Sequence, residues 1–494
     1  MEIKALNLNV SLELLLLDTL RLEERWMSTE ELSCSLKISR KKTENIIASL
    51  THKIKIFNSE QLILKTARGQ GNQLLVESNK VYIDFRRSII ENTLIYKIIF
   101  SIMFKKNSNI VSLALENFVS ESLVQKKIYK ANEFLKDFGV KIGTRKQELK
   151  FIGDENQIRI LIQNLLWRLY RGEEWPFYQV NEKLLKKIIY KFSESLNLKI
   201  EEITCNKITY ILAINYIRFK KGETIDLSNI TKRYSKLCLW VDSKTQIYNT
   251  LKMEFDLSKS EIDFFILHLI TQKDIYERLG NPDSILKNTP ADIATELLIK
   301  KYNNEFGRLT AEETTIFYKN IYPCHLYANL FSNLVFSETA GYYGLNIVSQ
   351  YLPIMKKTIE KMLYSLYIGS GMNIFLNHKY LLTEYLLTFS EFTSIVGKEK
   401  KVTILIDTDA SKVSEQFLIN QIKNRFSDLY NLELVTNIEK TNNNVDLVIS
   451  TTCLNDKQGM REDVQCFIIH LFPTQKEFDY IENYLKLLII KNTK

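Results

Sequence analysis

Glycine and proline are scarce in this sequence. Only 15 glycines and 6 prolines occur among 494 residues, which predicts mostly helical structure with short connections. The six cysteines are scattered, and no two of them have the C-x-x-C spacing of a zinc ribbon. We therefore expect reduced thiols and no structural metal site. The cysteines are Cys34, Cys205, Cys238, Cys324, Cys453 and Cys466.

The usual signals of membrane insertion, export and catalysis are also missing. No stretch of eighteen apolar residues occurs, so no membrane-spanning helix is expected. The short apolar run near the N-terminus contains Glu13 and Asp18 and lacks a basic leader, so it does not have the pattern of a signal peptide. No glycine-rich phosphate loop, metal cluster or nucleophile–base pair is present. The sequence therefore predicts a cytoplasmic protein that is not an enzyme, with no cofactor and no metal.

The composition is that of a globular chain with a small excess of positive charge. Hydrophobic residues make up 45% and charged residues 25% of it, which excludes a disordered chain. A length of 494 residues exceeds what one hydrophobic core supports, so three to five modules are expected. The formal net charge of +9 permits a polyanionic partner without requiring one.

The most informative pattern lies between residues 111 and 153. Apolar residues recur at helical spacing from Leu123 to Phe138, with Ser120 as a candidate N-cap and Gly139 where the helix should stop. A short apolar segment precedes this helix, and an alternating segment that suits a hairpin follows it. Helix, turn, basic helix and hairpin is the layout of a winged helix-turn-helix, whose second helix enters the major groove of DNA.

Polar and basic residues lie where such a helix and its hairpin would meet DNA. The predicted contacts to phosphates and base edges are Ser122, Gln125, Lys126, Lys127 and Lys130 on the helix, and Arg145 and Lys146 at the hairpin turn. The alternative is an ordinary amphipathic helix whose lysines are simply solvated. A second copy of the arrangement upstream favours DNA binding.

The upstream copy begins with a capping-box pattern formed by Ser28 and Glu31. After a polar turn, a second helix is predicted from Arg40 to Lys53, followed by a hairpin from Ile54 with a basic turn over residues 65–71. The exposed start of this helix and the turn supply the predicted DNA contacts. They are Arg40, Lys41, Lys42, Thr43, Asn45 and Arg68. The alternative is a helical hairpin that packs only against its neighbours.

The rest of the chain divides into helical and mixed regions. One long helix is predicted from Tyr82 to Lys105, between the two modules. From residue 175 to 393 helix follows helix, which indicates two bundles with a boundary at Gly280–Asn281–Pro282. In the second bundle a helix is predicted to start at Ile321. The last hundred residues alternate strand and helix, which predicts a small parallel α/β sheet.

The order of these regions resembles one known family, the Mga/AtxA-type transcription regulators of Gram-positive bacteria. Residues 120–159, including Phe138–Gly139–Val140 and Ile152–Gly153–Asp154, carry most of the resemblance. It implies a mainly α, multidomain fold with two winged helix-turn-helix modules, two bundles similar to PTS regulation domains and a C-terminal α/β domain similar to enzyme IIB of sugar transporters. The implied domains are residues 1–80, 81–172, 173–282, 283–397 and 398–494.

The resemblance also implies a function and partners. It implies a DNA-binding transcription regulator, an activator in virulence or carbohydrate-linked gene control, that is tuned by histidine phosphorylation from the sugar phosphotransferase system. The implied partners are double-stranded promoter DNA, a second copy of the chain held through the C-terminal domain, the phosphocarrier protein of that system, and RNA polymerase, with no membrane. His268 and His325 match the regulatory positions, and His378 is a looser candidate. The alternative is that His268 and His325 are core histidines hydrogen-bonded to their neighbours.

The C-terminal region departs from its enzyme IIB counterpart. The loop after its first strand contains Asp407 and Asp409 but no cysteine, so phosphoryl transfer through it is not expected. A response-regulator receiver needs an aspartate where Ser450 and Thr451 stand, which argues against that interpretation. Two other functions stay open, an RNA-binding antiterminator and an interaction scaffold without DNA binding. Antiterminators begin with a small β-rich domain, whereas this chain begins with helices.

Overall fold

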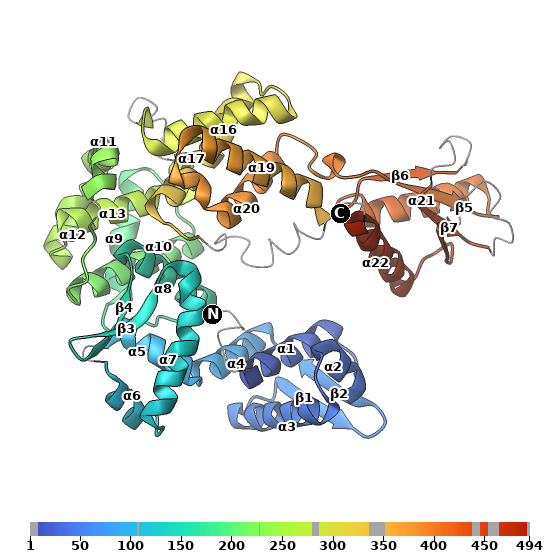
Figure 1. Ribbon diagram of the computed structural model, residues 1–494, viewed down its shortest axis with the longest axis horizontal. Helices are drawn as coiled ribbons and strands as arrows, with labels where there is room; N and C mark the ends of the chain where they lie inside the picture. The colour runs from blue at the N-terminus through green and yellow to red at the C-terminus, as the bar shows by residue number, and fades with distance from the viewer. Residues whose placement is uncertain are drawn as a thin grey trace. The chain divides into compact units, whose positions relative to one another are not determined.

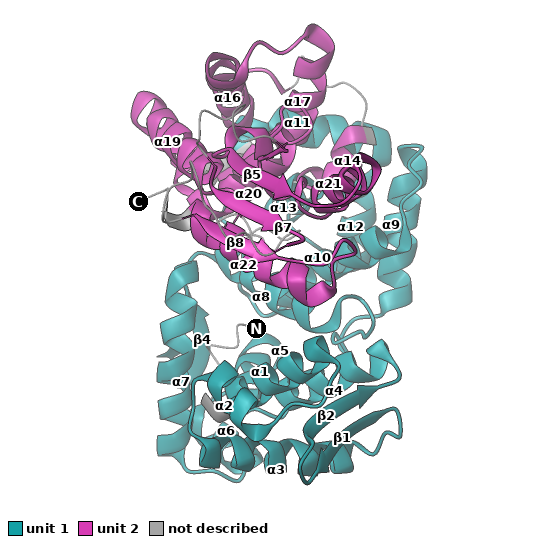
Figure 2. Ribbon diagram, turned by 90° about the vertical axis from the view of Figure 1, so that its right-hand side faces the viewer, with its two compact units in different colours: residues 1–269 teal, residues 270–494 magenta. Residues whose placement is uncertain are grey.

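The computed structural model describes residues 8–105, 108–226, 228–278, 286–334, 351–436, 445–452 and 464–491. The chain is mainly helical, as predicted, and divides into two compact units, residues 1–269 and 270–494 (Figures 1 and 2). None of the described helices is both long enough and apolar enough to cross a membrane. The bundle boundary predicted at Gly280–Asn281–Pro282 lies outside the described residues.

Three helices and a hairpin form the first module, drawn in dark blue to blue in Figure 1. They are α1 (Leu8–Glu23), α2 (Thr29–Leu36), α3 (Arg40–Phe57), β1 (Leu62–Ala67) and β2 (Gly71–Val76). Ser28 and Glu31 form the predicted capping box. The predicted start of the hairpin at Ile54 is wrong. Ile54 still belongs to the buried face of α3, and the first strand begins only at Leu62.

A backbone bridge closes the hairpin of the first module against the segment before α2. Met27 N donates to Asn72 O at 2.8 Å, and Asn72 N donates to Met27 O at 2.7 Å. Gly71 permits this close approach because its φ of +102° is open to glycine and a Cβ there would lie 2.2 Å from Met27 O. The bridge therefore fixes the hairpin beside the helix-turn-helix.

The second module repeats this plan with one more helix in front. It contains α4 (Asn79–Glu91), α5 (Leu94–Phe104), α6 (Ile110–Glu116), α7 (Glu121–Leu135), β3 (Lys141–Arg145), β4 (Glu148–Ile152) and α8 (Glu155–Tyr170). The predicted hairpin is confirmed. The prediction of a single helix from Tyr82 to Lys105 is wrong. The helix α4 ends at Glu91 with Asn92 as its C-cap, and Thr93 caps a new helix by accepting from Tyr96 N.

The middle of the chain is helical in both units. In unit 1 the helices after α8 are α9 (Glu182–Ser195), α10 (Glu202–Lys220), α11 (Ser228–Thr245), α12 (Ile247–Phe255) and α13 (Lys259–Ile270). In unit 2 the helices before the sheet are α14 (Lys273–Arg278), α16 (Pro290–Phe306), α17 (Ala311–Leu330), α19 (Pro353–Ser370) and α20 (His378–Phe389). The start predicted at Ile321 is wrong, because the Thr310–Glu313 capping box begins α17 earlier and Pro323 lies inside the helix.

The C-terminal part of unit 2 is the predicted small α/β sheet. Its strands are β5 (Val402–Asp407), β6 (Leu432–Val435), β7 (Leu447–Ser450) and β8 (Gln465–Ile468), all parallel and in the order β6-β5-β7-β8. The helices α21 (Lys412–Phe426) and α22 (Gln475–Lys491) complete it. Buried side chains of both helices, such as Leu418 and Ile481, pack with Ile404 and Leu447 of the sheet in one core.

The tight contact at Gly71 predicts a specific weakness of the first module. Gly71→Ala should destabilise it by roughly 2 kcal/mol, because the new methyl group collides with the backbone of Met27. Gly69→Ala is the matched control, since Gly69 also has a positive φ but nothing lies within 4 Å of its added Cβ. Hydrogen–deuterium exchange of residues 25–76 in the full chain measures both. Equal protection in the two variants would contradict the role of the bridge.

Candidate nucleic-acid interface

The second helix of the second module, α7, is held by a well-defined turn. Phe118 in the turn has a φ of +53°, and the hydroxyl of Ser120 accepts from Leu123 N at 3.3 Å, so Ser120 is the N-cap as predicted. The inner face of α7 buries Val124, Ala131 and Leu135. This packing leaves one face of the helix directed outward along its length.

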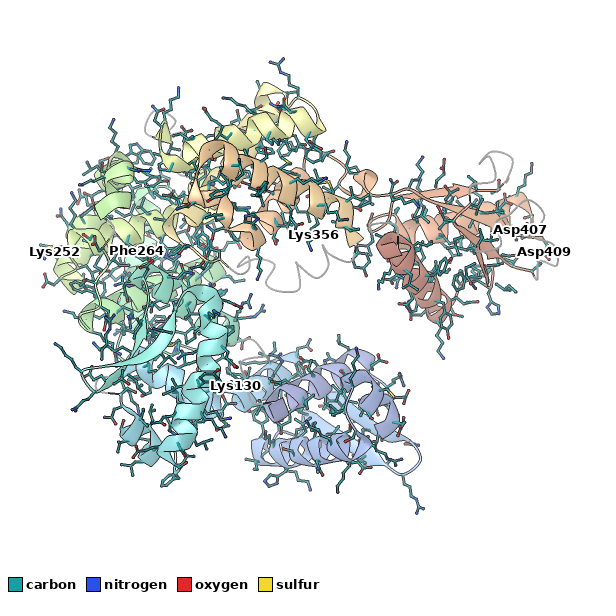
Figure 3. The ribbon with its side chains drawn as sticks, viewed as in Figure 1. Lys130, Lys252, Phe264, Lys356, Asp407 and Asp409 are labelled. Atoms are coloured by element: carbon teal, nitrogen blue, oxygen red, sulfur yellow. The ribbon has the colours of Figure 1, made fainter. Side chains whose placement is uncertain are left out.

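The outer face of α7 carries most of the residues predicted to contact DNA. Ser122, Gln125 and Lys126 are exposed, and Tyr129, which the sequence analysis passed over, is 71% exposed. Their positions follow the i, i+3, i+4, i+7 spacing of a single helix face. Lys127 and Lys130 are half-buried beside this face, and Figure 3 labels Lys130 on α7. The helix thus presents polar side chains flanked by positive charge.

Three lysines of α7 form a cluster without compensating carboxylates. No ion pair within the described residues involves Lys126, Lys127 or Lys130, whereas Lys105 pairs with Glu116 at 2.7 Å and Lys150 with Glu223 at 3.0 Å. Burial, and then the charges of Lys130 and Lys126, lower the pKa of Lys127. An approaching polyanion would relieve this repulsion, which favours phosphate binding at the cluster.

The hairpin of the second module is attached directly to α7. The side chain of Asn132 accepts from Ile142 N at 2.6 Å and donates to Ile142 O at 3.0 Å. At the tip, Lys146 and Gln147 both have positive φ, as a type I′ turn requires. Arg145 and Lys146 are exposed there, as predicted. The hairpin therefore holds two positive side chains at a fixed position relative to the helix.

In the first module, α3 occupies the position that α7 has in the second. Lys41 and Asn45 are exposed on it, Lys42 is half-buried, and Arg68 is exposed at the hairpin turn. Arg40 is exposed too, but its guanidinium already lies 3.2 Å from Glu44 and 4.0 Å from Glu30. Because those carboxylates compete with a phosphate, Arg40 is a weaker candidate than the α7 lysines.

Thr43 does not fit its predicted role in DNA contact. Its side chain is fully buried and its hydroxyl donates to Ser39 O at 3.2 Å, so it stabilises the first turn of α3. Sequence reasoning also passed over His52 and Lys55, which are exposed on the same face as Lys41 and border a groove of about 470 Å³ between α3 and the hairpin. The helical spacing of these positions was the signal that could have identified them.

His325 is a fully buried histidine with both ring nitrogens hydrogen-bonded. Nδ1 lies 2.8 Å from the Thr295 hydroxyl, and Nε2 lies 2.6 Å from the Tyr385 hydroxyl. Because the Thr295 hydroxyl donates to Ala291 O, the ring must donate from Nδ1 and accept at Nε2 from Tyr385. Burial lowers the pKa of His325 to about 3. The imidazole is therefore neutral and forms part of the bundle core.

The other two candidate regulatory histidines, His268 and His378, differ from His325 in their surroundings. His268 is 2% exposed on α13, with its ring 5.8 Å from that of Phe264. His378 is half-buried at the first position of α20. Neither His268 nor His325 offers a ring nitrogen at the surface of the described structure. The expected regulatory role of these histidines consequently depends on a different bundle conformation.

A buried network of charges joins α8 of the second module to the first bundle. Arg159 is 2% exposed and donates to both carboxylate oxygens of Glu261, at 2.5 and 3.1 Å, and to Glu155 at 2.9 Å. Arg218 of α10 donates to both oxygens of Glu155, at 2.8 and 2.6 Å. Glu261 lies on α13, two helical turns before His268. The second module and the histidine-bearing helix α13 are thus linked by hydrogen bonds.

The loop after β5 is the remaining site considered from the sequence. Figure 3 labels Asp407 and Asp409 at the carboxyl end of the strand, and Thr451 donates to Asp409 at 3.0 Å. Cys453 lies outside the described residues. Among the residues that are described, no group of three His, Cys, Asp or Glu side chains is arranged to hold a metal ion.

The environment of His325 predicts a pH-dependent stability. The unfolded chain takes up a proton near the ordinary pKa of 6.5, whereas the folded bundle accepts it only at about pH 3, so stability must fall as the pH falls through this window. His325→Gln removes the titration. The stability difference between the native protein and this variant should narrow by roughly 2 kcal/mol between about pH 7 and pH 5. Denaturant unfolding of both full chains measures it, and a constant difference would contradict the buried neutral histidine.

Sequence comparisons point to regulators of transcription. A family model described as the Mga helix-turn-helix domain matches residues 81–166. The chain is 22% identical to the capsule synthesis positive regulator AcpB of Bacillus anthracis, over 97% of this chain and 99% of that protein. It is 21% identical to the anthrax toxin expression trans-acting positive regulator of the same organism, over 94% and 95% of the two chains. A similar 21% identity to the capsule synthesis positive regulator AcpA covers 60% of this chain and 64% of that protein. The resemblance stated from the sequence is therefore confirmed: residues 81–166 match the Mga helix-turn-helix domain, and the chain is similar over nearly its whole length to positive regulators of the Mga/AtxA type.

Proposed function

We propose that this protein is a DNA-binding transcription activator whose two winged helix-turn-helix modules contact one long or bipartite DNA site. The observation that carries the proposal is the uncompensated cluster of Lys126, Lys127 and Lys130 on the outer side of α7, within the matched Mga domain. The relatives are named positive regulators, which supports activation rather than repression.

In the second module we assign different roles to different side chains. Ser122 and Gln125 lie in the first half of α7, the part of a recognition helix that meets base edges, and their side chains suit hydrogen bonding to bases. The three lysines and the hairpin pair Arg145 and Lys146 neutralise phosphates and set the register on the duplex. Specificity would therefore depend on few residues, and affinity on the positive charge around them.

In the first module the contacts come from a similar but less positive face. Lys41, Lys42, Asn45 and Arg68 are the proposed contacts. We also propose His52 and Lys55, because they are exposed on the same helix face and line the groove beside it. Glu44 lies on the same face and reduces its attraction for phosphates. We infer that the second module contributes more of the salt-dependent affinity than the first.

For the histidines we propose that a phosphoryl group would act by holding a bundle open. A phosphohistidine carries a dianion that the core around His325 cannot accommodate, because the ring contacts Thr295, Tyr385 and Phe375 there. For His268, opening of α13 would pull on Glu261 and hence on Arg159 of the DNA-binding module. The phosphocarrier protein of the sugar phosphotransferase system is the proposed donor.

Self-association is proposed to use the C-terminal α/β domain. Large apolar side chains are exposed at the end of β8, after it and along α22, and such surfaces often mark interfaces. They are Ile468, Phe472, Tyr480 and Leu487, each more than half exposed. A homodimer would present two copies of each module to the promoter, and RNA polymerase is the remaining proposed partner.

The lysine cluster gives a quantitative test of DNA binding. The double variant Lys126→Ala, Lys127→Ala should bind duplex promoter fragments more weakly, and the slope of log K against log salt should fall by roughly 1.8, because each phosphate contact contributes about 0.9. The matched control is Lys183→Ala, Lys187→Ala, which removes two exposed lysines of α9 that form no ion pair within the described chain. Fluorescence anisotropy across a salt series measures both.

Three outcomes would remove the proposal. An unchanged slope in the α7 variant would show that these lysines do not meet phosphates. Tighter binding to matched RNA than to duplex DNA would favour an antiterminator, and no binding to either would favour a scaffold.

A further inference from the structure

A small cavity lies within unit 1 where the second module meets the first bundle. Its volume is about 250 Å³. The end of α5, the strand β4 and the C-terminal turn of α10 contribute its walls. Drug-sized ligands occupy pockets of roughly 300–1,000 Å³, so this cavity suits a smaller molecule.

The walls of the cavity carry more positive than negative charge. Lys105, Lys150, Arg218, Lys220 and Lys221 line it, against only Glu148 and Glu223. Three of these cations have ion-pair partners: Lys105 binds Glu116, Lys150 binds Glu223 and Arg218 binds Glu155. Lys220 and Lys221 have no carboxylate partner among the described residues.

Lys221 is held at the cavity wall by backbone groups. Its Nζ donates to Ile102 O at 2.7 Å and to Lys105 O at 2.9 Å, the last carbonyls of α5, and approaches Met103 O less closely at 3.4 Å. Burial, followed by the charge of Arg218, lowers the pKa of Lys221 to about 8. Lys221 is half-buried, and the charges of Glu223 and Glu148 raise its pKa too little to offset the effect of burial.

Lys220 completes the pair on the side open to solvent. It is exposed, and its Nζ lies 5.6 Å from the centre of the Tyr216 ring. Two adjacent cations, one half-buried and one exposed, can bind an anion by a charge-assisted hydrogen bond from each. The cavity is polar, which also suits a charged ligand that keeps part of its hydration.

We propose that this cavity binds a small phosphate-bearing anion through Lys220 and Lys221. The anion is either inorganic phosphate or the phosphate group of a small phosphorylated metabolite, since both present the same dianion to the lysines. The site goes beyond DNA binding and does not depend on it. A bound anion would contact both the DNA-binding module and the first bundle. It would therefore stabilise the packing of these two parts against each other that the structure shows.

The test is calorimetric titration of the full chain, without DNA, with three probes at constant ionic strength set by chloride. The probes are inorganic phosphate, glucose 6-phosphate and, as the uncharged comparison, glucose. Binding of phosphate is expected, and Lys220→Gln should weaken it roughly tenfold, because one charge-assisted bond is lost. Lys187→Gln on α9 is the control and should bind as the native protein does.

Lys221 needs a variant that preserves the end of α5. Lys221→Arg keeps the charge and the carbonyl contacts and should retain binding, whereas Lys221→Gln should lose it. Phosphate affinity should also fall as the pH rises from about 8 to about 9, because inorganic phosphate is already a dianion there while Lys221 gives up its proton. Glucose 6-phosphate binding tighter than phosphate would identify a phosphorylated metabolite as the ligand, and equal affinity would identify free phosphate.

Three results would overturn the proposal. The first is that neither phosphate nor glucose 6-phosphate binds. The second is that Lys220→Gln and Lys187→Gln bind phosphate equally well. The third is that glucose binds as tightly as glucose 6-phosphate, because the cavity would then recognise the sugar and not the anion.

Discussion

The hydrogen-bonded pair of Arg159 and Glu261 is the constraint on which unit 1 depends. Both side chains are almost completely buried, and the guanidinium uses both carboxylate oxygens of Glu261. Removing one partner of such a pair costs about 3–5 kcal/mol, because the remaining charge stays buried without compensation. The helix α8 of the DNA-binding module and the helix α13 of the bundle therefore cannot separate without a large loss of free energy. Any signal that reaches the bundle has a structural route to the DNA-binding helices.

The distribution of charge separates the cations that stabilise the fold from those that we propose to bind DNA. Arg159, Arg218 and Lys150 lie against carboxylates of their own chain, so they stabilise the fold. Lys126, Lys127 and Lys130 form no ion pair with any carboxylate in the described part of the chain, although aspartate and glutamate are common in the sequence. Keeping like charges together without partners costs stability, and a site that binds a polyanion recovers that cost on binding. The same reasoning distinguishes α7 from α3, where Glu44 accompanies Arg40.

Local signals made much of the fold predictable, and misleading local signals account for the errors. The helix caps at Ser28 and Ser120 and the hairpin over residues 141–152 depend on residues close together in the sequence. These features could therefore be predicted from the sequence. The apolar pattern continues across Asn92, which hid the break between α4 and α5. Proline usually lies at the start or just after the end of a helix, so Pro323 suggested that a helix starts near Ile321. In the structure Pro323 lies inside α17, where tertiary packing outweighs this local preference. Thr43 shares its face with Ile46 and Ile47, and this spacing already placed it inward.

The amide of Asn132 has a consequence for the DNA binding that we propose. It ties α7 to the hairpin through two hydrogen bonds to one residue, Ile142, so the two elements cannot spread apart to follow an ill-fitting duplex. The DNA must then adjust the distance between its major groove, where α7 would lie, and the neighbouring phosphate backbone, which the hairpin would contact. Sequences that bend or narrow at low elastic cost would be preferred, even at base pairs that no side chain touches.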